Sequence, residues 1–255
     1  MEKRVLIAGK EFPAGTDFAS GTAAHKRRVV VSGEFSRDDE GTFSAPSGVF
    51  PVVWNKSSAL ASRTFLLGAV NQLFDLDEIY LIFDEHYYSS KISSGKNGSD
   101  SIRIFEEMIV SYQYLMAEIL ERLTKKHEKN QDRSSNPIKV VFVHKENVTK
   151  IDTVLSSKSF GNDPSLPMLS AASAAFKSFA ENTAAQLTET KLFSPLLVQC
   201  EPGSDYSNRD TSLSSWLCDY LNSLDNLKSP LSVKDKLTWI KAGSKKPGSG
   251  FSLFR

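Results

Sequence analysis

Short runs of β-branched and aromatic residues alternate along the chain with longer segments of helical periodicity. The short runs predict strands at residues 4–8, 28–32, 49–54, 78–83, 139–144 and 195–200, with a further strand at 250–254. Several runs are apolar on both faces, as is typical of a parallel sheet that helices cover on both sides. The pattern therefore predicts an α/β fold with a doubly wound, Rossmann-like and mostly parallel sheet.

Between these runs, apolar residues recur at helical spacing. The spacing predicts helices at residues 57–74, 102–123, 169–187 and 216–227, a short first helix within 16–25, and a last one at 232–239. Three polar stretches, 36–48, 89–101 and 125–136, are rich in glycine, serine and charge and predict exposed loops. Because none of them is long enough to separate domains, we expect residues 1–255 to form a single domain.

The charge balance gives no whole-molecule reason to expect a nucleic-acid or membrane partner. There are 31 Lys and Arg residues against 30 Asp and Glu, for a net charge of +1. The apolar run near the first residue is too short for a secretory signal, and the sequence contains no stretch of about 18 apolar residues. We therefore expect a cytoplasmic protein in which Cys200 and Cys218 are core thiols.

The order of strands and helices, ending in a strand that runs into Pro202 and Gly203, resembles the short-chain dehydrogenase/reductase family. The likeness is sharpest at this proline-glycine pair and at the small-residue helix of 171–187 (AASAAFKSFAENTAAQL). The resemblance implies a dinucleotide cofactor, NAD or NADP, and a tyrosine and a lysine one helical turn apart as the proton-transfer pair. It also implies a dimer or tetramer built from the two long helices.

The resemblance places the cofactor site at Gly9 and Gly15 after the first strand, Glu34 after the second, Asp84 after the fourth, and Pro202 and Gly203 after the sixth. A glycine turn lets the backbone approach a pyrophosphate, and Glu34 could accept a hydrogen bond from a ribose hydroxyl. The middle position of the family's glycine pattern is Pro13, and Asp17 places a negative charge at the start of the helix. We therefore expect NAD or NADP to bind weakly or not at all.

The four catalytic positions implied by the resemblance all carry other residues. Leu169 occupies the place of the tyrosine and Ser173 that of the lysine, Lys145 lies where the supporting serine is expected, and Ile109 replaces the helix asparagine. A phenol whose pKa is lowered by an ammonium group is the proton donor that carbonyl reduction requires. The sequence therefore predicts no catalytic residue at the expected places.

Two other acid–base pairs can be formed from the sequence. His144 ends the fifth predicted strand, and Lys177 lies one turn beyond Ser173, so these two could replace the missing pair. Tyr87 and Lys91 match the tyrosine–lysine spacing literally, but they fall in a stretch expected to be a loop. The histidines show no metal-ligand spacing, so no metal site is expected.

These patterns lead to one main hypothesis and two alternatives. The chain is expected to be a divergent, catalytically impaired relative of the short-chain dehydrogenases with a binding, regulatory or assembly role, as a homo-oligomer. The first alternative is an active NAD(P)-dependent oxidoreductase with a non-standard catalytic set. The second is a binder of a different small molecule in the crevice at the carboxyl ends of the strands.

Overall fold

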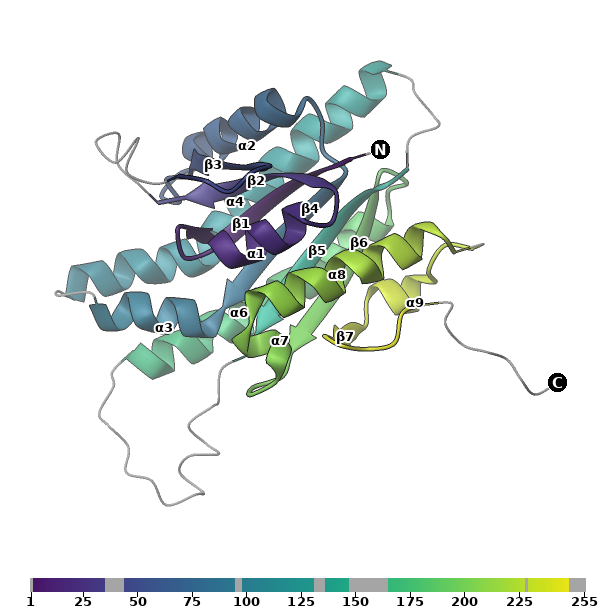
Figure 1. The fold of residues 1–255 in the computed structure, drawn as a ribbon. Coiled ribbons are helices and arrows are strands. Elements are labelled where there is room, and N and C mark those ends of the chain that lie inside the picture. Colours follow the sequence, from purple (N-terminus) through teal and green to yellow (C-terminus); the bar gives the residue numbers. More distant parts are fainter. Residues whose placement is uncertain are drawn as a thin grey trace.

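The computed structural model describes residues 2–34, 44–94, 98–130, 136–146, 165–227 and 229–247. Within these residues the strands form one parallel seven-stranded sheet in the order β3-β2-β1-β4-β5-β6-β7 (Figure 1). The strands are β1 (Lys3–Phe12), β2 (Arg27–Gly33), β3 (Val49–Val53), β4 (Glu78–Asp84), β5 (Ile138–Lys145), β6 (Phe193–Cys200) and β7 (Trp239–Lys241). The predicted doubly wound α/β fold is confirmed.

Helices cover both faces of this sheet (Figure 1). One face carries α1 (Thr16–Ala23) and α8 (Asp210–Asp225), which pack on each other. The other carries α2 (Ala59–Leu73), α3 (Glu85–Ser94), α4 (Gly98–Asn130) and α6 (Ser165–Thr188). Two short helices, α7 (Asp205–Asn208) and α9 (Val233–Lys236), flank α8 in the sequence.

The central strand β4 shows why the sequence is apolar on both faces. Ile79, Leu81 and Phe83 point into the core beneath α2, α4 and α6, whereas Tyr80 and Ile82 point into the core beneath α1 and α8. Every residue of β4 is buried. Alternate residues of one strand thus supply two cores, which is the reason for its unbroken apolar run.

Two predicted segments adopt a different structure. The polar stretch 89–101 was expected to be a loop, and this was wrong for its described residues. They form the end of α3 and the start of α4. The Asp84 carboxylate caps α3 by accepting hydrogen bonds from the backbone N–H groups of His86 and Tyr87. α4 also runs on to Asn130, seven residues past its predicted end at 123.

The carboxyl-terminal part of the predicted pattern was also wrong. The helix expected at 232–239 is limited to Val233–Lys236, and Trp239–Lys241 instead forms the edge strand β7, which pairs with β6. The strand expected at 250–254 lies outside the described residues. A three-residue strand is defined by its pairing partner, and periodicity within three residues cannot reveal it.

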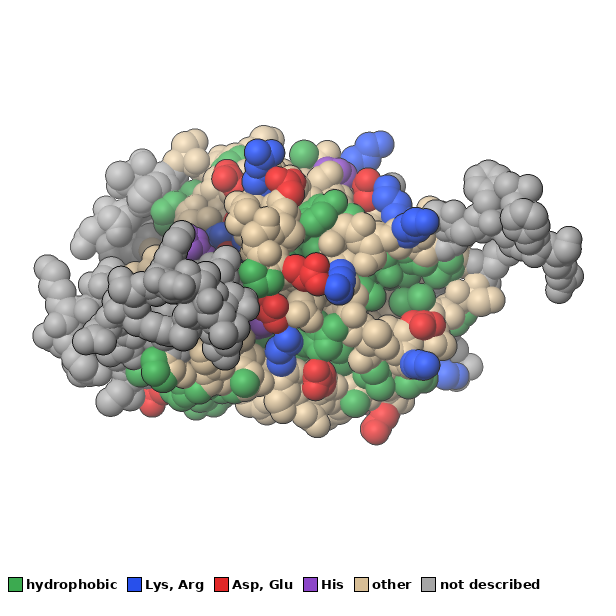
Figure 2. Space-filling model, turned by 90° about the horizontal axis from the view of Figure 1, so that it is seen from below, with side chains coloured by type: hydrophobic (Ala, Val, Ile, Leu, Met, Phe, Trp, Pro, Cys, Tyr) green, Lys and Arg blue, Asp and Glu red, His purple; other side chains and the backbone are tan. Residues whose placement is uncertain are grey.

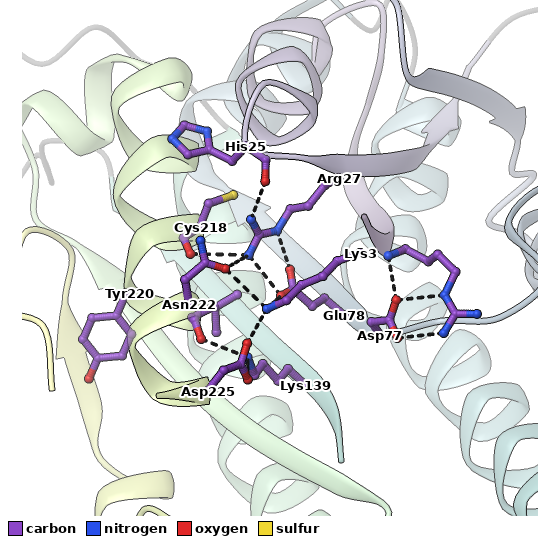
Figure 3. Close-up of polar contacts among 12 residues, drawn as sticks. Lys3, His25, Arg27, Asp77, Glu78, Lys139, Cys218, Tyr220, Asn222 and Asp225 are labelled. Atoms are coloured by element: carbon purple, nitrogen blue, oxygen red, sulfur yellow. Dashed lines mark hydrogen bonds and ion pairs between the residues drawn. The ribbon is translucent and has the colours of Figure 1, made fainter. Parts of the chain in front are cut away.

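At the amino-terminal edge of the sheet, a polar network fixes the start of β1, β2 and β4 against the end of α8 (Figure 3). Glu78 accepts hydrogen bonds from Arg27 at 2.8 Å and from Lys3 at 2.9 Å. Arg27 also donates to Asn222 on α8, and Lys3 and Lys139 both pair with Asp225. Although burial opposes ionisation of Glu78, the adjacent Arg27 and Lys3 outweigh it and lower the pKa of the carboxyl group.

Candidate functional site at the carboxyl edge of the sheet

The carboxyl ends of β1, β4 and β5 meet the start of α8 in a closed ring of four charged side chains. Lys10 donates to Asp84 at 2.8 Å and to Asp210 at 2.6 Å. Lys145 donates to the same two carboxylates, at 2.9 Å and 2.5 Å. Three members follow from the fold, since parallel strands end at one edge, and Asp210 reaches them from the first turn of α8.

Two members of this ring are held firmly in their charged forms. Burial opposes the charge of Asp84, but Lys145 and Lys10 outweigh it and lower the pKa of this carboxyl group to about 2. Burial likewise disfavours the ammonium form of Lys145, but Asp84 and Asp210 outweigh it and raise the pKa of the amine. With two ammonium and two carboxylate groups the ring is neutral as a whole, and each lysine already has two carboxylate partners.

A cavity of about 530 Å³ lies over this ring. Its walls come from β1, β4 and β5 and from the starts of α1, α3 and α8. They include His86, three basic side chains and four acidic side chains. The charged side chains are Lys10, Lys145, Arg209, Asp17, Asp84, Glu146 and Asp210. With histidine neutral, the lining is acidic by one charge, which disfavours a pyrophosphate group.

The two glycines expected to hold a phosphate have structural explanations. Gly9 lies within β1 at φ 110°, and a Cβ atom there would come within 2.1 Å of the Ile82 carbonyl oxygen and 2.4 Å of the Tyr112 hydroxyl. Gly15 closes a tight turn, where a Cβ atom would lie 2.3 Å from the Lys10 carbonyl oxygen. Both positions require glycine because protein atoms approach them closely.

Tyrosines occupy the point where the strand order reverses, between β1 and β4. The Tyr88 hydroxyl donates to the Gly9 carbonyl oxygen at 3.2 Å, and the Tyr112 hydroxyl donates to the Ile82 carbonyl oxygen at 2.6 Å. The two hydroxyls are 3.0 Å apart. Burial raises the pKa of both phenols well above the ordinary value, so they are neutral donors. In doubly wound folds this switch point is where a ligand crevice usually opens.

A buried ion pair extends this tyrosine cluster toward β2. Lys56 forms an ion pair with Glu11 and donates a hydrogen bond to the Tyr88 hydroxyl at 3.0 Å. The Tyr87 hydroxyl donates to Glu11 as well. Sequence reasoning did not identify Lys56, Glu11, Tyr88 or Tyr112 as parts of a site. The adjacent tyrosines 87 and 88 directly after a buried strand were the one available signal.

The expected catalytic places are filled by core and network side chains. Leu169 is buried in the core beneath α4 and α6, and Ile109 packs at the edge of the same core. Lys145 belongs to the charged ring. Ser173 donates a hydrogen bond to Glu85 at 2.6 Å and lies 2.8 Å from His144 Nε2. The structure thus brings Ser173 and the end of β5 together.

His144 is fully buried and packs against aromatic rings. It stacks on Phe83 and Phe176. Its Nδ1 atom has no hydrogen-bond partner within the described residues and lies 3.7 Å from Glu146 Oε1. Lys177 donates to the same oxygen at 2.9 Å. His144 and Lys177, considered above as a replacement pair, thus both approach the same Glu146 oxygen, but only Lys177 forms a hydrogen bond with it.

The remaining predicted cofactor residues lie apart from the ring. Glu34 forms an ion pair with Lys91 at 2.6 Å. Pro202 and Gly203 form an exposed turn, in which a Cβ atom at Gly203 would meet nothing within 4 Å. Tyr87 and Lys91 were expected in a loop, and this was wrong, because both lie on α3, with the Lys91 ammonium 5.3 Å from the centre of the Tyr87 ring.

Acidic and basic side chains are mixed over the face shown in Figure 2, without a region of one sign. Among the described residues, no group of three or more His, Cys, Asp or Glu side chains is placed to hold a metal ion. In the same part of the chain, no helix is long and apolar enough to cross a membrane.

The strand order, the switch point between β1 and β4 and the two helical layers define a doubly wound protein of the Rossmann type. No protein-family model matches the sequence, and the search of the curated proteins found no match. Solved structures share the fold: a 3-ketoacyl-(acyl-carrier-protein) reductase of Brucella melitensis, complexed with NADH, has a TM-score of 0.55 at 13% identity, covering 94% of this chain and 96% of the reductase.

Two further structures match over most of their length. A short-chain dehydrogenase/reductase of Serratia marcescens has a TM-score of 0.55 at 12% identity, with 94% of this chain and 97% of that one covered. A short-chain dehydrogenase of Mycobacterium smegmatis has a TM-score of 0.54 at 14% identity, with 96% and 93% covered. The chain therefore has the fold of the short-chain dehydrogenase/reductases.

Proposed function

We propose that this chain is a divergent short-chain dehydrogenase-like protein that has lost hydride transfer and acts as a binding, regulatory or assembly protein. The observation that carries the proposal is the tyrosine pair at the switch point. The Tyr88 hydroxyl donates to the carbonyl oxygen of Gly9, so its ring lies at the turn where a dinucleotide-binding protein would hold phosphate. Leu169 and Ser173 support it, since neither is an acid that can protonate a carbonyl oxygen.

The acidic cavity over the charged ring is the binding site in this proposal. Its volume of about 530 Å³ suits a small molecule. Each ammonium group has used two of its three hydrogens in the ring, so Lys10 and Lys145 each retain one donor for a ligand. A small polar ligand without a strong negative charge fits this lining better than a dinucleotide does.

A cofactor titration tests the proposal directly. The melting temperature of the protein would be followed with NADH and with NADPH from micromolar concentration to 1 mM, with NADH fluorescence as a second readout. We expect no saturable change in either readout. The assay would detect binding, since a ligand at 100 times its Kd stabilises the folded state by about 2.7 kcal/mol. A saturable shift at micromolar cofactor would overturn the proposal.

An active oxidoreductase remains the second candidate, and one contact favours it. His144 and Ser173 are hydrogen-bonded at the end of β5, with Glu85 and Glu146 on either side of the histidine. Because His144 is fully buried, a proton from it would reach a carbonyl oxygen only through the Ser173 hydroxyl. NADPH oxidation with a panel of aldehydes and ketones tests this: turnover that is lost in His144→Gln supports the enzyme, and absence of turnover in the wild type excludes it for those substrates.

A further inference from the structure

A second, smaller cavity lies at the amino-terminal edge of the sheet, at the opposite end of the strands from the charged ring. Its volume is about 200 Å³, and the starts of β1, β4 and β5 and the end of α8 form its walls. The charged side chains that line it are Glu2, Lys3, Asp77, Glu78, Lys139 and Asp225. The two lysines come from different strands and share the Asp225 carboxylate (Figure 3).

The two amines of this cavity differ in the number of hydrogen bonds that they donate. Lys3 donates three, and the acceptors are Glu78 at 2.9 Å, Asn222 at 3.4 Å and Asp225 at 2.5 Å. Lys139 donates two, to the Leu221 carbonyl oxygen at 2.9 Å and to Asp225. An ammonium group carries three hydrogens and a neutral amine two. Within the described residues, the acceptors around Lys3 therefore match an ammonium group, and those around Lys139 match a neutral amine.

The surroundings of Lys139 act in the same direction. Burial is the largest effect, and together with the Lys3 ammonium it lowers the pKa of Lys139, although Asp225 and Glu78 oppose this. Burial also disfavours the charge of Lys3, but Glu78 and Asp225 outweigh it and raise the pKa of that amine. Arg27 on β2 is held by Glu78. A desolvated lysine beside a second cation is an arrangement that makes an amine nucleophilic.

The size and the charge of the cavity limit what this amine can meet. A volume of about 200 Å³ lies below the roughly 300–1,000 Å³ of ordinary ligand pockets, so only a molecule of few heavy atoms fits. With Lys139 neutral, the described lining carries four carboxylates against the single ammonium of Lys3. This excess of negative charge disfavours anionic carbonyl compounds such as keto acids and sugar phosphates.

We propose that Lys139 is a reactive amine that binds small uncharged aldehydes in this cavity as a Schiff base. The nitrogen lone pair attacks the carbonyl carbon, and a C–N bond forms as the carbonyl π electrons move to oxygen. Asp225 already accepts a hydrogen bond from this nitrogen, so it is placed to take the first proton and return it to that oxygen. Loss of water, which carries away both amine hydrogens, gives the imine without an oxidant or a reductant.

Trapping with acetaldehyde and borohydride tests this proposal. The full chain is incubated with acetaldehyde at pH 7 and reduced with sodium borohydride, and mass spectrometry gives the rate of ethylation at each lysine. A lysine of ordinary pKa is neutral in only about one molecule in 2,500 at pH 7. Lys139 should therefore be trapped about tenfold faster, or more, than Lys125, whose side chain is 64% exposed. This ratio should fall as the pH rises from 7 to 10, because exposed amines gain far more of the neutral form.

Two variants, each checked for folding by circular dichroism, test the part played by Lys3. In Lys3→Met the neighbouring ammonium is lost, so trapping at Lys139 should fall about tenfold at pH 7, the factor for a pKa that rises by one unit. Lys241→Met is the matched control, since Lys241 is exposed and pairs with Glu201. It should leave trapping at Lys139 unchanged.

Three outcomes would overturn the proposal. In the wild type these are trapping at Lys139 no faster than at Lys125, or a ratio that does not fall with pH. The third is a loss of trapping in Lys241→Met as large as in Lys3→Met. Because this cavity and the charged ring lie at opposite edges of the sheet, the result is independent of the cofactor titration.

Discussion

Replacing Asp84 by asparagine removes the one carboxylate group that both links the two lysines and caps α3. The asparagine side chain would keep an oxygen for the backbone N–H groups of His86 and Tyr87, so the helix cap survives and the change isolates the charge. Lys10 and Lys145 would then share Asp210 alone. Breaking a buried ion pair typically costs about 3–5 kcal/mol, and we expect about 3 kcal/mol here at pH 7 because Asp210 remains.

The pH dependence of this loss follows from the pKa of Asp84. Burial opposes its ionisation, yet Lys145 and Lys10 lower the pKa from the ordinary 3.8 to about 2. A carboxyl group whose pKa is lower in the folded state stabilises the protein at pH values above its pKa in the unfolded state. This contribution is lost as the pH falls from 3.8 toward 2. The shift corresponds to about 2.4 kcal/mol. The difference in unfolding free energy between wild type and Asp84→Asn should therefore stay constant from pH 7 to pH 5 and shrink by about 1 kcal/mol by pH 3, and the rest of the contribution is lost below pH 3.

Urea denaturation followed by circular dichroism at pH 7, 5 and 3 measures this difference. Asp219→Asn is the control, since Asp219 pairs with Lys246 at the surface and both side chains are nearly half exposed. That change should cost about 0.5 kcal/mol or less at every pH. A loss below about 1 kcal/mol for Asp84→Asn at pH 7, against the range for broken buried pairs, would refute the reasoning. So would a loss that does not change with pH.

Two further changes, one of them with a control, test the packing at the two edges of the sheet. Gly9→Ala should destabilise by about 3 kcal/mol, because its Cβ atom would lie 2.1 Å from the Ile82 carbonyl oxygen at a φ of 110°. Gly203→Ala is the control: with φ 73° and no atom within 4 Å of the added Cβ, it should cost about 1 kcal/mol. Equal losses of unfolding free energy for Gly9→Ala and Gly203→Ala in urea denaturation would contradict the prediction. Glu78→Gln leaves the buried Arg27 without its carboxylate and should cost about 3–5 kcal/mol; a change in melting temperature no larger than that of Asp219→Asn would argue against it.

The sheet and the long helices were predictable because each has a strong pattern. Strands buried on both faces read as unbroken apolar runs, and α4 shows a helical repeat over more than four turns. The structure of residues 85–94 was not predictable in this way. Its serines favour a loop, but the Asp84 cap and the burial of Tyr87, Tyr88 and Ile92 against the core outweigh that local preference.

Part of the charged ring could have been found from the sequence. Lys10, Asp84 and Lys145 each lie at the end of a predicted strand, and the ends of parallel strands meet at one edge. Asp210 could not have been found, since it follows a polar segment without a strand pattern and reaches the edge only through the packing of α8 on α1. The resemblance gave Asp84 to a cofactor, whereas its pairing with two lysines depends on contacts between residues far apart in sequence.

The glycines show why a sequence motif can be present without the chemistry that is usually associated with it. In a dinucleotide-binding turn, a glycine lets the backbone come close to phosphate; here Gly9 lets Tyr112 and β4 come close to β1. The same absence of a side chain serves either purpose, so the sequence cannot distinguish them. The charges distinguish the two purposes: Asp84 and Asp210 already pair with both lysines, so an anionic ligand would find the positive charge of Lys10 and Lys145 balanced. A ligand of this edge must therefore bind without taking over those pairs.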